Sequence, residues 1–332
     1  MKKAKEFGVG IESAHTRRYT ELARLAQELG YGTCWIPEDF YRGAFTLASA
    51  VACNTRRLRI GMGILNPYLR HPAAIAMELG ALEEISEAQV VVGIGAGVRA
   101  WIEGQLGIPY RKPAAAMRET IEIIQALFAG GEVSYEGDVF TIKHLNLHFA
   151  PPRKRLPVFL GVLGPKNLEL AGEIADGLLL SAMSSPGYVK YALEHVRIGA
   201  QRAGRSLHDF EVAANLFISI DKNEKAAREA TRPFIAMLMP FMPPHMFEAA
   251  GFELEELARF KEAAAEGEPA VNLDTDRFID AFTIAGSPER CREAIADLIE
   301  SGVTSPVAFE VMGVDPEKSI RDVHRHLMPY FL

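Results

Sequence analysis

The sequence predicts a (β/α)8 barrel, a closed ring of eight parallel strands that is surrounded by helices. Short apolar runs alternate with amphipathic helical segments over nearly all of the 332 residues. Eight of these runs are followed by helix, which is the number that a closed parallel barrel requires. Barrels of this length also run as one domain. An open, doubly wound sheet is the alternative fold, because strands and helices alternate in it as well.

The first half of the chain holds four of the expected strands. They cover Phe7–Ile11, Thr33–Ile36, Leu58–Leu65 and Gln89–Ile94. Helices are expected at Arg17–Leu29, Ala73–Ile85 and Pro113–Phe128. Gly30 suits the end of the first helix, because glycine readily adopts the left-handed conformation found there. Pro72 suits the first position of the second helix, where no backbone N–H is needed.

An interruption separates the two halves. Residues 130–150 alternate between apolar and polar around a Glu136-Gly137-Asp138 turn, which predicts an inserted hairpin. The other four strands are expected at Val158–Val162, Gly177–Ser181, Phe210–Ile220 and Val303–Phe309. Their helices are expected at Pro165–Ala175, Gly187–Ala203, Pro288–Ser301 and Pro316–Met328, with two or more further helices in Glu224–Ala281.

We expect one domain, residues 1–332, because no linker, low-complexity segment or short repeat divides the chain. Insertions are expected at about 98–112, 130–150 and 237–282. The net charge of −7 and the pI near 5.8 argue against nucleic acid or an anionic membrane as partner. No apolar stretch is long enough to span a bilayer, and the N-terminal residues do not resemble a signal peptide. The expected location is the cytoplasm, and the expected partner is a small-molecule substrate.

The sequence lacks several catalytic motifs. A P-loop, a Gly-x-Ser-x-Gly elbow and a His-Glu-x-x-His helix are all missing, which argues against nucleotide hydrolysis, acyl transfer and zinc hydrolysis. Cys34, Cys53 and Cys291 lie far apart and form no metal-binding or disulfide pattern. We therefore expect no metal site.

In a (β/α)8 barrel the functional residues lie on the loops that follow the carboxyl ends of the strands. This rule selects polar and glycine-rich segments, namely Glu12–His15, Glu38–Arg42, Asn66–Pro72, Gly93–Gly97, Gly161–Asn167 and Ser181–Ser184. Each has a plainer interpretation as well. Glu12 also fits a solvated or ion-paired carboxylate, and His71 also fits a residue that only orients its loop.

The two glycine-rich loops differ in what they indicate. Gly93–Gly97 follows a strand as a dinucleotide fingerprint does, but Val98 stands where the third glycine would be. It is better interpreted as backbone that approaches a flat ligand closely, since glycine has no Cβ. The second loop, Gly161–Gly164, precedes a helix that starts with Pro165. Free amides at a helix start favour an anion, so this loop is a candidate phosphate site, with a tight turn as the alternative.

These segments, in this order, resemble the luciferase-like superfamily, and most closely its deazaflavin-dependent branch. Within that branch the chain looks like the methylenetetrahydromethanopterin reductases and their bacterial relatives. The matching segments are Phe7–Glu12, Gly61–Tyr68, Arg70–Pro72, Gly93–Gly97, Gly164–Gly177 and Ala285–Glu289. They run from near the N-terminus to the last part of the chain, so the resemblance covers almost all of it.

The resemblance implies a bulge in the third strand, with a non-proline cis peptide at Gly63-Ile64 that backs the deazaflavin ring. It places Asp39 and Asn66 at the polar edge of the cofactor. Glu12 and Asp39 are implied as catalytic residues, Glu12 for proton handling or charge stabilisation. The cofactor-binding set is Glu38, Asp39, Gly63, Ile64, Asn66, Gly95, Gly97, Gly161, Val162, Leu163, Gly164, Pro165 and Ser181. The substrate-binding set is Tyr68, Met183 and Met242.

The implied reaction is hydride transfer between coenzyme F420 and a small heterocyclic or enone-type substrate, possibly a methylene-tetrahydropterin. One alternative is an FMN-dependent monooxygenase, for which only Lys166 offers a cation near the candidate phosphate site. Another is a barrel that binds a flavin without catalysis. Val98 motivates it, because reductases of this type often carry an acidic residue at that position. The resemblance also implies a homodimer or a higher homo-oligomer.

Overall fold

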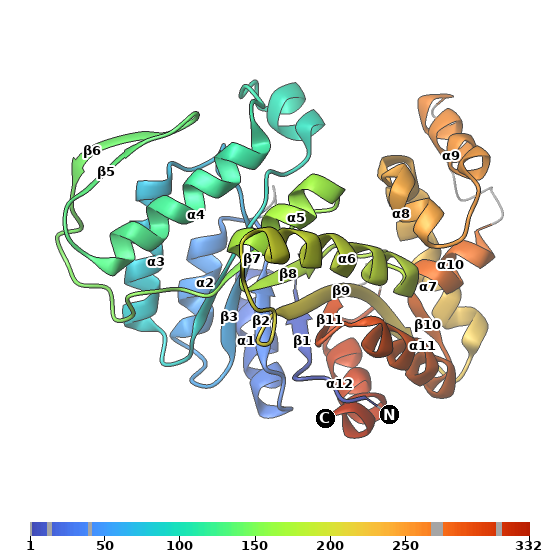
Figure 1. Cartoon of the computed structure of the whole chain (residues 1–332). Coiled ribbons are helices and arrows are strands. Elements are labelled where there is room, and N and C mark those ends of the chain that lie inside the picture. The colour runs from blue at the N-terminus through green and yellow to red at the C-terminus, as the bar shows by residue number, and fades with distance from the viewer. Residues whose placement is uncertain (1, 12–14, 39–41, 267–274, 310–313) are drawn as a thin grey trace.

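The computed structural model describes residues 2–11, 15–38, 42–266, 275–309 and 314–332 (Figure 1). Eight strands form one ring in it. They are β1 (Gly8–Gly10), β2 (Thr33–Ile36), β3 (Arg59–Leu65), β4 (Val90–Ile94), β7 (Val158–Leu160), β8 (Gly177–Leu180), β9 (Glu211–Ile220) and β11 (Ser305–Phe309). The order runs from β9 through β11, β1, β2, β3, β4 and β7 to β8, and β8 pairs with β9 to close the ring.

Every pairing within this ring is parallel, so the predicted closed barrel is confirmed and the open sheet is wrong. A further strand, β10 (Ile284–Gly286), pairs with the end of β9 at Ile218–Ile220. The sequence analysis does not predict β10, which has only three residues. β11 pairs with β9 as far as Phe217, and β10 continues the barrel wall along the last three residues of β9.

Helices surround the barrel (Figure 1). They are α1 (Thr16–Glu28), α2 (Ala44–Ala52), α3 (Pro72–Ile85), α4 (Pro113–Ala129), α5 (Pro165–Ile174), α6 (Pro186–Arg202), α7 (Glu224–Leu238), α11 (Pro288–Ser301), α12 (Pro316–His326) and α13 (Met328–Phe331). The sequence analysis does not predict α2. This helix contains no charged residue, so its sequence lacks the alternation of apolar and polar faces that marks the others.

The three expected insertions contain additional elements. The first holds a π-helix, η1 (Ala100–Gln105), and the second forms the predicted antiparallel hairpin of β5 (Val133–Glu136) and β6 (Thr141–Leu145). The third holds η2 (Met239–Phe241), α8 (Pro244–Ala249), α9 (Leu254–Glu266) and α10 (Asp276–Phe282). In Figure 1 the hairpin lies beside α4, at the opposite edge of the molecule from α8 and α9. Within the described ranges, no helix is both long and apolar enough to cross a membrane.

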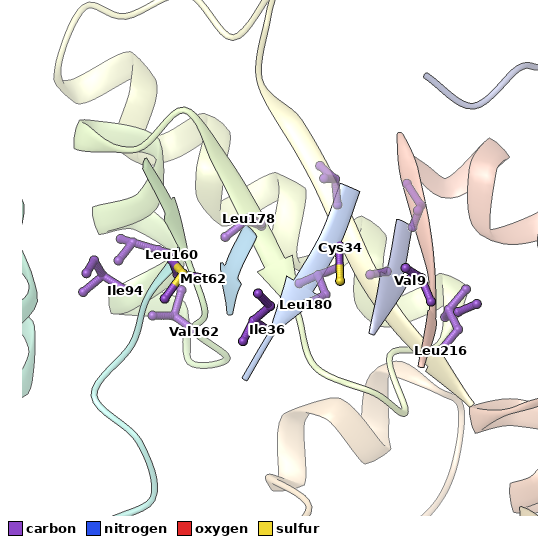
Figure 2. Packing of buried hydrophobic residues seen from close by; sticks show 14 of the residues in the cluster. Val9, Cys34, Ile36, Met62, Ile94, Leu160, Val162, Leu178, Leu180 and Leu216 are labelled. Carbon is purple, nitrogen blue, oxygen red and sulfur yellow. The ribbon is translucent and has the colours of Figure 1, made fainter. Parts of the chain in front are cut away.

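Side chains alternate along each strand between the helices and the barrel interior. The outward ones belong to one large buried apolar cluster, in which Figure 2 labels Val9, Cys34, Ile36, Met62, Ile94, Leu160, Leu178, Leu180 and Leu216. The inward ones form a separate buried cluster of Trp35, Val91, Phe159, Leu179, Ala213 and Val307. Trp35 takes up much of this layer, because a Cβ at Gly61 would lie 2.5 Å from its ring. The middle of the barrel is therefore packed solid.

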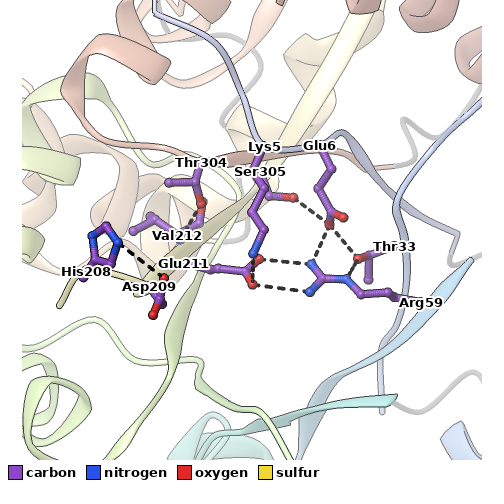
Figure 3. A network of polar contacts seen from close by, with 10 residues as sticks. All are labelled: Lys5, Glu6, Thr33, Arg59, His208, Asp209, Glu211, Val212, Thr304 and Ser305. Atoms are coloured by element: carbon purple, nitrogen blue, oxygen red, sulfur yellow. Dashed lines mark hydrogen bonds and ion pairs between the residues drawn. The ribbon is translucent and has the colours of Figure 1, made fainter. Parts of the chain in front are cut away.

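A polar network lies one layer below, at the amino ends of the strands (Figure 3). Arg59 on β3 contacts Glu6 at 2.8 Å and Glu211 at 3.1 Å, and Lys5 contacts Glu211 at 2.6 Å. Thr33 donates to Glu6 at 2.6 Å. The network joins residues at or next to β1, β2, β3 and β9, so it ties four strands together at this end. A ligand site must lie at the other end of the barrel.

Candidate active site

A cavity of about 370 Å³ opens at the carboxyl ends of the strands. This volume lies within the range of small-molecule sites. Its lining comes from β3, β4, β7, β8 and β9 and the loops after them, with two residues from the first insertion and one each from α4 and α5. The lining residues are Gly63, Ile64, Ala96, Gly97, Val98, Tyr110, Met117, Gly161, Val162, Leu163, Gly164, Asn167, Leu179, Ser181 and Asn215. None of these described side chains carries a charge.

The floor of the cavity is the third layer of inward positions, two residues beyond the packed cluster. Glycine occupies two of these positions in the lining, Gly63 and Gly161. Gly95, in the loop after β4, lies behind the lining next to Ile64. A Cβ at Gly161 would lie 2.5 Å from Cγ2 of Ile64, and one at Gly95 would lie 2.2 Å from its Cδ1. The glycines therefore let the Ile64 side chain sit low in the barrel, which leaves room above it.

Ile64 belongs to an irregularity in β3. The pairing with β4 shifts register between Met62 and Leu65, and the Gly63-Ile64 peptide bond is cis, as the resemblance implies. A Cβ at Gly63 would lie 2.8 Å from both Leu179 and Trp35, so this backbone rests directly on the packed middle layer. The bulge thus has a firm support beneath it and faces the cavity.

Asn66 joins the loops after β3 and β4. Its side chain is buried, its amide nitrogen donates to the Ala96 carbonyl at 3.1 Å, and its amide oxygen accepts from the Tyr68 backbone N–H at 2.8 Å. Gly97 has a φ of 70°, and a Cβ there would lie 2.4 Å from the Asn66 amide nitrogen. Asn66 therefore shapes the wall of the cavity and does not itself line it.

Two tyrosines hold the first insertion against the rim. Tyr110 lines the cavity and donates its hydroxyl to the Gly97 carbonyl at 3.3 Å. Tyr68 packs against Tyr110 with ring centroids 5.0 Å apart and donates its hydroxyl to the Arg111 carbonyl at 2.7 Å. Burial raises the pKa of Tyr68 to about 12, so the hydroxyl keeps its proton for this hydrogen bond at neutral pH.

The loop from β7 to α5 forms the far wall. Gly164 precedes α5 without a side-chain cap. Pro165 has no N–H and the Asn167 N–H donates to the Gly164 carbonyl at 3.1 Å, so the amides of Gly164 and Lys166 are the ones that can bind an anion here. A Cβ at Gly164 would meet nothing within 4 Å, which shows open space beside the helix start. Lys166 is exposed and does not line the cavity. The helix start alone therefore supplies the positive potential on this wall.

The Leu163 carbonyl of the same loop is fixed by two hydrogen bonds from other elements. It accepts hydrogen bonds from the Tyr188 hydroxyl at 2.7 Å and from Nε2 of His245 at 2.9 Å. Tyr188 lies on α6, and His245 lies on α8 in the third insertion. The insertion is thus attached directly to a wall of the cavity.

Tyr188→Phe is expected to lower the free energy of unfolding by about 0.5–1.5 kcal/mol, because the Leu163 carbonyl loses one of its two donors. Urea denaturation measures the change. Tyr191→Phe is the matched control, since it removes a hydroxyl from the same aromatic cluster without touching Leu163. An equal loss from both variants would contradict a specific role for Tyr188.

Comparison with known proteins identifies the family. The luciferase-like monooxygenase model matches residues 4–305. The chain belongs to the luciferase-like monooxygenase family. The match includes all of the strands that build the cavity floor.

Relatives of this luciferase-like chain match it over its whole length. A 5,10-methylenetetrahydromethanopterin reductase from Archaeoglobus fulgidus is 34% identical over 331 residues, 96% of this chain and 98% of the relative. One from Methanopyrus kandleri is 34% identical over 355 residues, 98% of this chain and 99% of the relative. A solved structure, the coenzyme F420 dependent tetrahydromethanopterin reductase from Methanopyrus kandleri, superposes with a TM-score of 0.91 at 30% identity and full coverage of both chains.

The cavity of this luciferase-like barrel brings together eight of the predicted cofactor-binding residues. They are Gly63, Ile64, Gly97, Gly161, Val162, Leu163, Gly164 and Ser181. Gly95, Asn66 and Pro165 lie directly behind the lining. Glu38 lies at the end of β2, and its carboxylate pairs with Arg70 at 2.9 Å. The predicted catalytic residues Glu12 and Asp39 fall outside the described residues.

The predicted substrate-binding residues do not line the described cavity. Tyr68 supports the rim, and Met183 and Met242 are buried. His71 accepts from the Ala73 N–H at 3.2 Å and so caps α3, in line with its plainer interpretation. Asn167 lies in the predicted loop Gly161–Asn167, but four lining residues were not predicted, namely Tyr110, Met117, Leu179 and Asn215. Leu179 and Asn215 could have been found by counting inward positions in twos along their strands.

Proposed function

We propose that this protein is an oxidoreductase that transfers a hydride between coenzyme F420 and a methylene-tetrahydropterin. One observation carries the proposal. An uncharged cavity with a glycine-rich floor lies at the Gly63-Ile64 bulge, in a chain that is 34% identical over nearly its full length to 5,10-methylenetetrahydromethanopterin reductases. The FMN-dependent monooxygenase and the non-catalytic flavin-binding barrel are the alternatives.

The residues present fit a flat ring with an anionic tail. Gly95 and Gly161 lack the Cβ atoms that would push Ile64 into the cavity, so a planar ring can lie against Gly63 and Ile64. The free amides at Gly164 and the start of α5 suit a phosphate-bearing tail, which the open space beside Gly164 admits. Coenzyme F420, when bound, supplies the hydride chemistry.

The chain's own side chains bind and orient the ligands and exclude water from them. The described lining is uncharged, so any proton handling by the protein falls to residues outside it. We assign this role to Glu12, with Asp39 at the polar edge of the ring. In the sequence, both come shortly after strands of the barrel, Glu12 after β1 and Asp39 after β2.

Equilibrium binding of coenzyme F420 and of FMN to the purified protein tests the cofactor, and fluorescence quenching reports it. We expect micromolar or tighter binding of F420 and negligible binding of FMN. Oxidation of reduced F420 by methylene-tetrahydromethanopterin, followed by absorbance, then tests the reaction. The reverse binding preference would favour the FMN monooxygenase. Binding without turnover of any acceptor would favour the non-catalytic barrel.

We also propose that the chain is a single domain, that it forms a homodimer and that it works in the cytoplasm. One continuous buried cluster runs from Ala4 to Phe331, which supports a single domain. The uncharged helix α2 packs beside α3, on which Met77 is 52% exposed, and a second copy would cover this weakly polar face. Three unpaired cysteines suit a reducing compartment. Light scattering measures the mass and so tests the dimer.

A further inference from the structure

Asn215 lies on the floor of the cavity and has an unused hydrogen-bonding group. It is the inward residue of β9 two positions beyond Ala213, and Val307 of β11 is its partner in the sheet register. Its amide oxygen is buried and has no hydrogen-bond partner. Buried polar atoms in folded proteins nearly always have a partner, so an exception on a cavity floor requires an explanation.

Among the described residues, no neighbouring side chain provides that partner. Val307, Leu179 and Ile64 are apolar. The Ser181 hydroxyl, two positions beyond Leu179, donates to the Ala182 carbonyl at 2.9 Å. Trp35 Nε1 is also without a partner, but the indole belongs to the packed layer below and makes no hydrogen bond with Asn215. Because Asn215 lines the cavity, a ligand bound there can supply a partner once the amide turns toward it.

The chemistry of the amide specifies what would satisfy it. A primary amide presents an N–H donor and a C=O acceptor side by side, and this pair is complementary to a ring edge with an N–H next to a C=O. Such a lactam edge occurs in the pyrimidine ring of flavins and deazaflavins and in the pyrimidinone ring of pterins. In flavins and deazaflavins the N–H has a carbonyl on each side, so this edge can pair with the amide in either orientation.

We propose that Asn215 binds the lactam edge of the ring that occupies the cavity and thereby fixes which edge points into the barrel. This inference rests on the proposed function for the identity of the ring. It assigns Asn215 a positioning role, because the hydrogen bonds orient the ring and take no part in bond making. Two ligands carry the edge, the deazaflavin and the pterin, and binding experiments separate them.

Asn215→Leu is the decisive variant, because leucine has nearly the same size and no polar atom. If Asn215 only stabilised the fold, its replacement by leucine would lower the stability of the protein. An asparagine that serves a ligand leaves a buried atom unsatisfied in the free protein, so the leucine variant should melt at the wild-type temperature or above it. The same variant should bind coenzyme F420 about ten- to a hundred-fold more weakly, since the lactam edge loses its partners.

The experiment measures melting temperature, the F420 dissociation constant and the KM for methylene-tetrahydromethanopterin in wild type, Asn215→Leu and Asn215→Ala. The alanine variant keeps the test valid if leucine prevents folding. Asn146→Ala, at an exposed position in the hairpin insertion, is the control. An analogue methylated at N3 of the deazaflavin should bind wild type weakly and should lose nothing further in the variants.

The outcomes distinguish the possibilities. A weakened F420 dissociation constant assigns the edge to the deazaflavin, and a raised KM with unchanged F420 binding assigns it to the pterin. Unchanged binding of both ligands overturns the inference while the proposed function stands. If wild type binds FMN and not F420, the proposed function fails, and the same variants tested with FMN decide the role of Asn215, because FMN has the same edge. If no ring binds, a lower melting temperature of Asn215→Leu assigns a structural role and overturns the inference.

Discussion

Gly161→Ala is expected to weaken binding of coenzyme F420 about ten- to a hundred-fold, or about 1–3 kcal/mol. The new Cβ would lie 2.5 Å from Cγ2 of Ile64, a distance that real Cβ atoms do not show. Cγ2 is close to the backbone, so Ile64 must change its rotamer or shift with the bulge. Either movement carries the side chain into the space proposed for the ring. Fluorescence titration of the purified variant with F420 measures the loss.

A double-mutant cycle with Ile64→Ala isolates this contact. The Ile64 Cβ lies 3.7 Å from the position that the new methyl group would take, so truncation of Ile64 removes the clash. Gly161→Ala should therefore cost little affinity in the Ile64→Ala background, although Ile64→Ala alone also weakens binding. Gly104→Ala, where a Cβ meets nothing within 4 Å, controls for the substitution itself. Additive losses in the cycle would show that Gly161 acts through something other than Ile64.

The barrel was predictable from sequence because buried parallel strands are short apolar runs between recognisable helix stops and starts. All eight barrel strands lie within or at the predicted ranges. The two misses have physical reasons. Helix α2 has no polar face to give a helical period, and β10 has three residues, too few for any period to appear.

The site was predictable where a strand end is followed by glycine. Gly161 and Gly164 stand out in the sequence, and the structure places both on the cavity wall. Asn215 did not stand out, because it lies inside a long apolar strand and not on the loop after it, where the site residues were sought. Tyr68 is the converse case. It follows a strand end as a ligand-binding residue would, yet its hydroxyl is used to hold the rim.

Arg59→Met is expected to destabilise the protein by about 3–5 kcal/mol, because it leaves two carboxylates of the amino-terminal network facing one another with one cation fewer. The side chains of Arg59, Glu6 and Glu211 are only 17%, 15% and 14% exposed, so water screens them poorly. Thermal unfolding followed by circular dichroism measures the change, and we expect the midpoint to fall by several degrees. Arg56→Met, whose side chain is 79% exposed, is the matched control and should change little.

The pH dependence of the stability lost in Arg59→Met identifies the cause of that loss. Burial raises the pKa of Glu211, but hydrogen bonds from Arg59 and Lys5 outweigh it, so the pKa lies below the ordinary value. A lowered pKa in the folded state contributes stability above the unfolded pKa, near 4.5, that is lost as pH falls through the folded value. Arg59→Met removes most of this contribution. The difference in the free energy of unfolding between wild type and Arg59→Met should therefore be largest at pH 7 and should decrease below about pH 4.5.

Neutralising the whole network tests the same cause without acid. The triple variant Glu6→Gln, Arg59→Met, Glu211→Gln replaces the three largely buried charged groups with neutral ones of similar size and leaves the exposed Lys5 in place. Because burial of ions is costly and a complete neutral replacement is often tolerated, this variant should regain much of the stability that Arg59→Met loses. A triple variant as unstable as Arg59→Met, together with a gap that does not change with pH, would mean that Arg59 supports the barrel through packing of its aliphatic part and not through its charge.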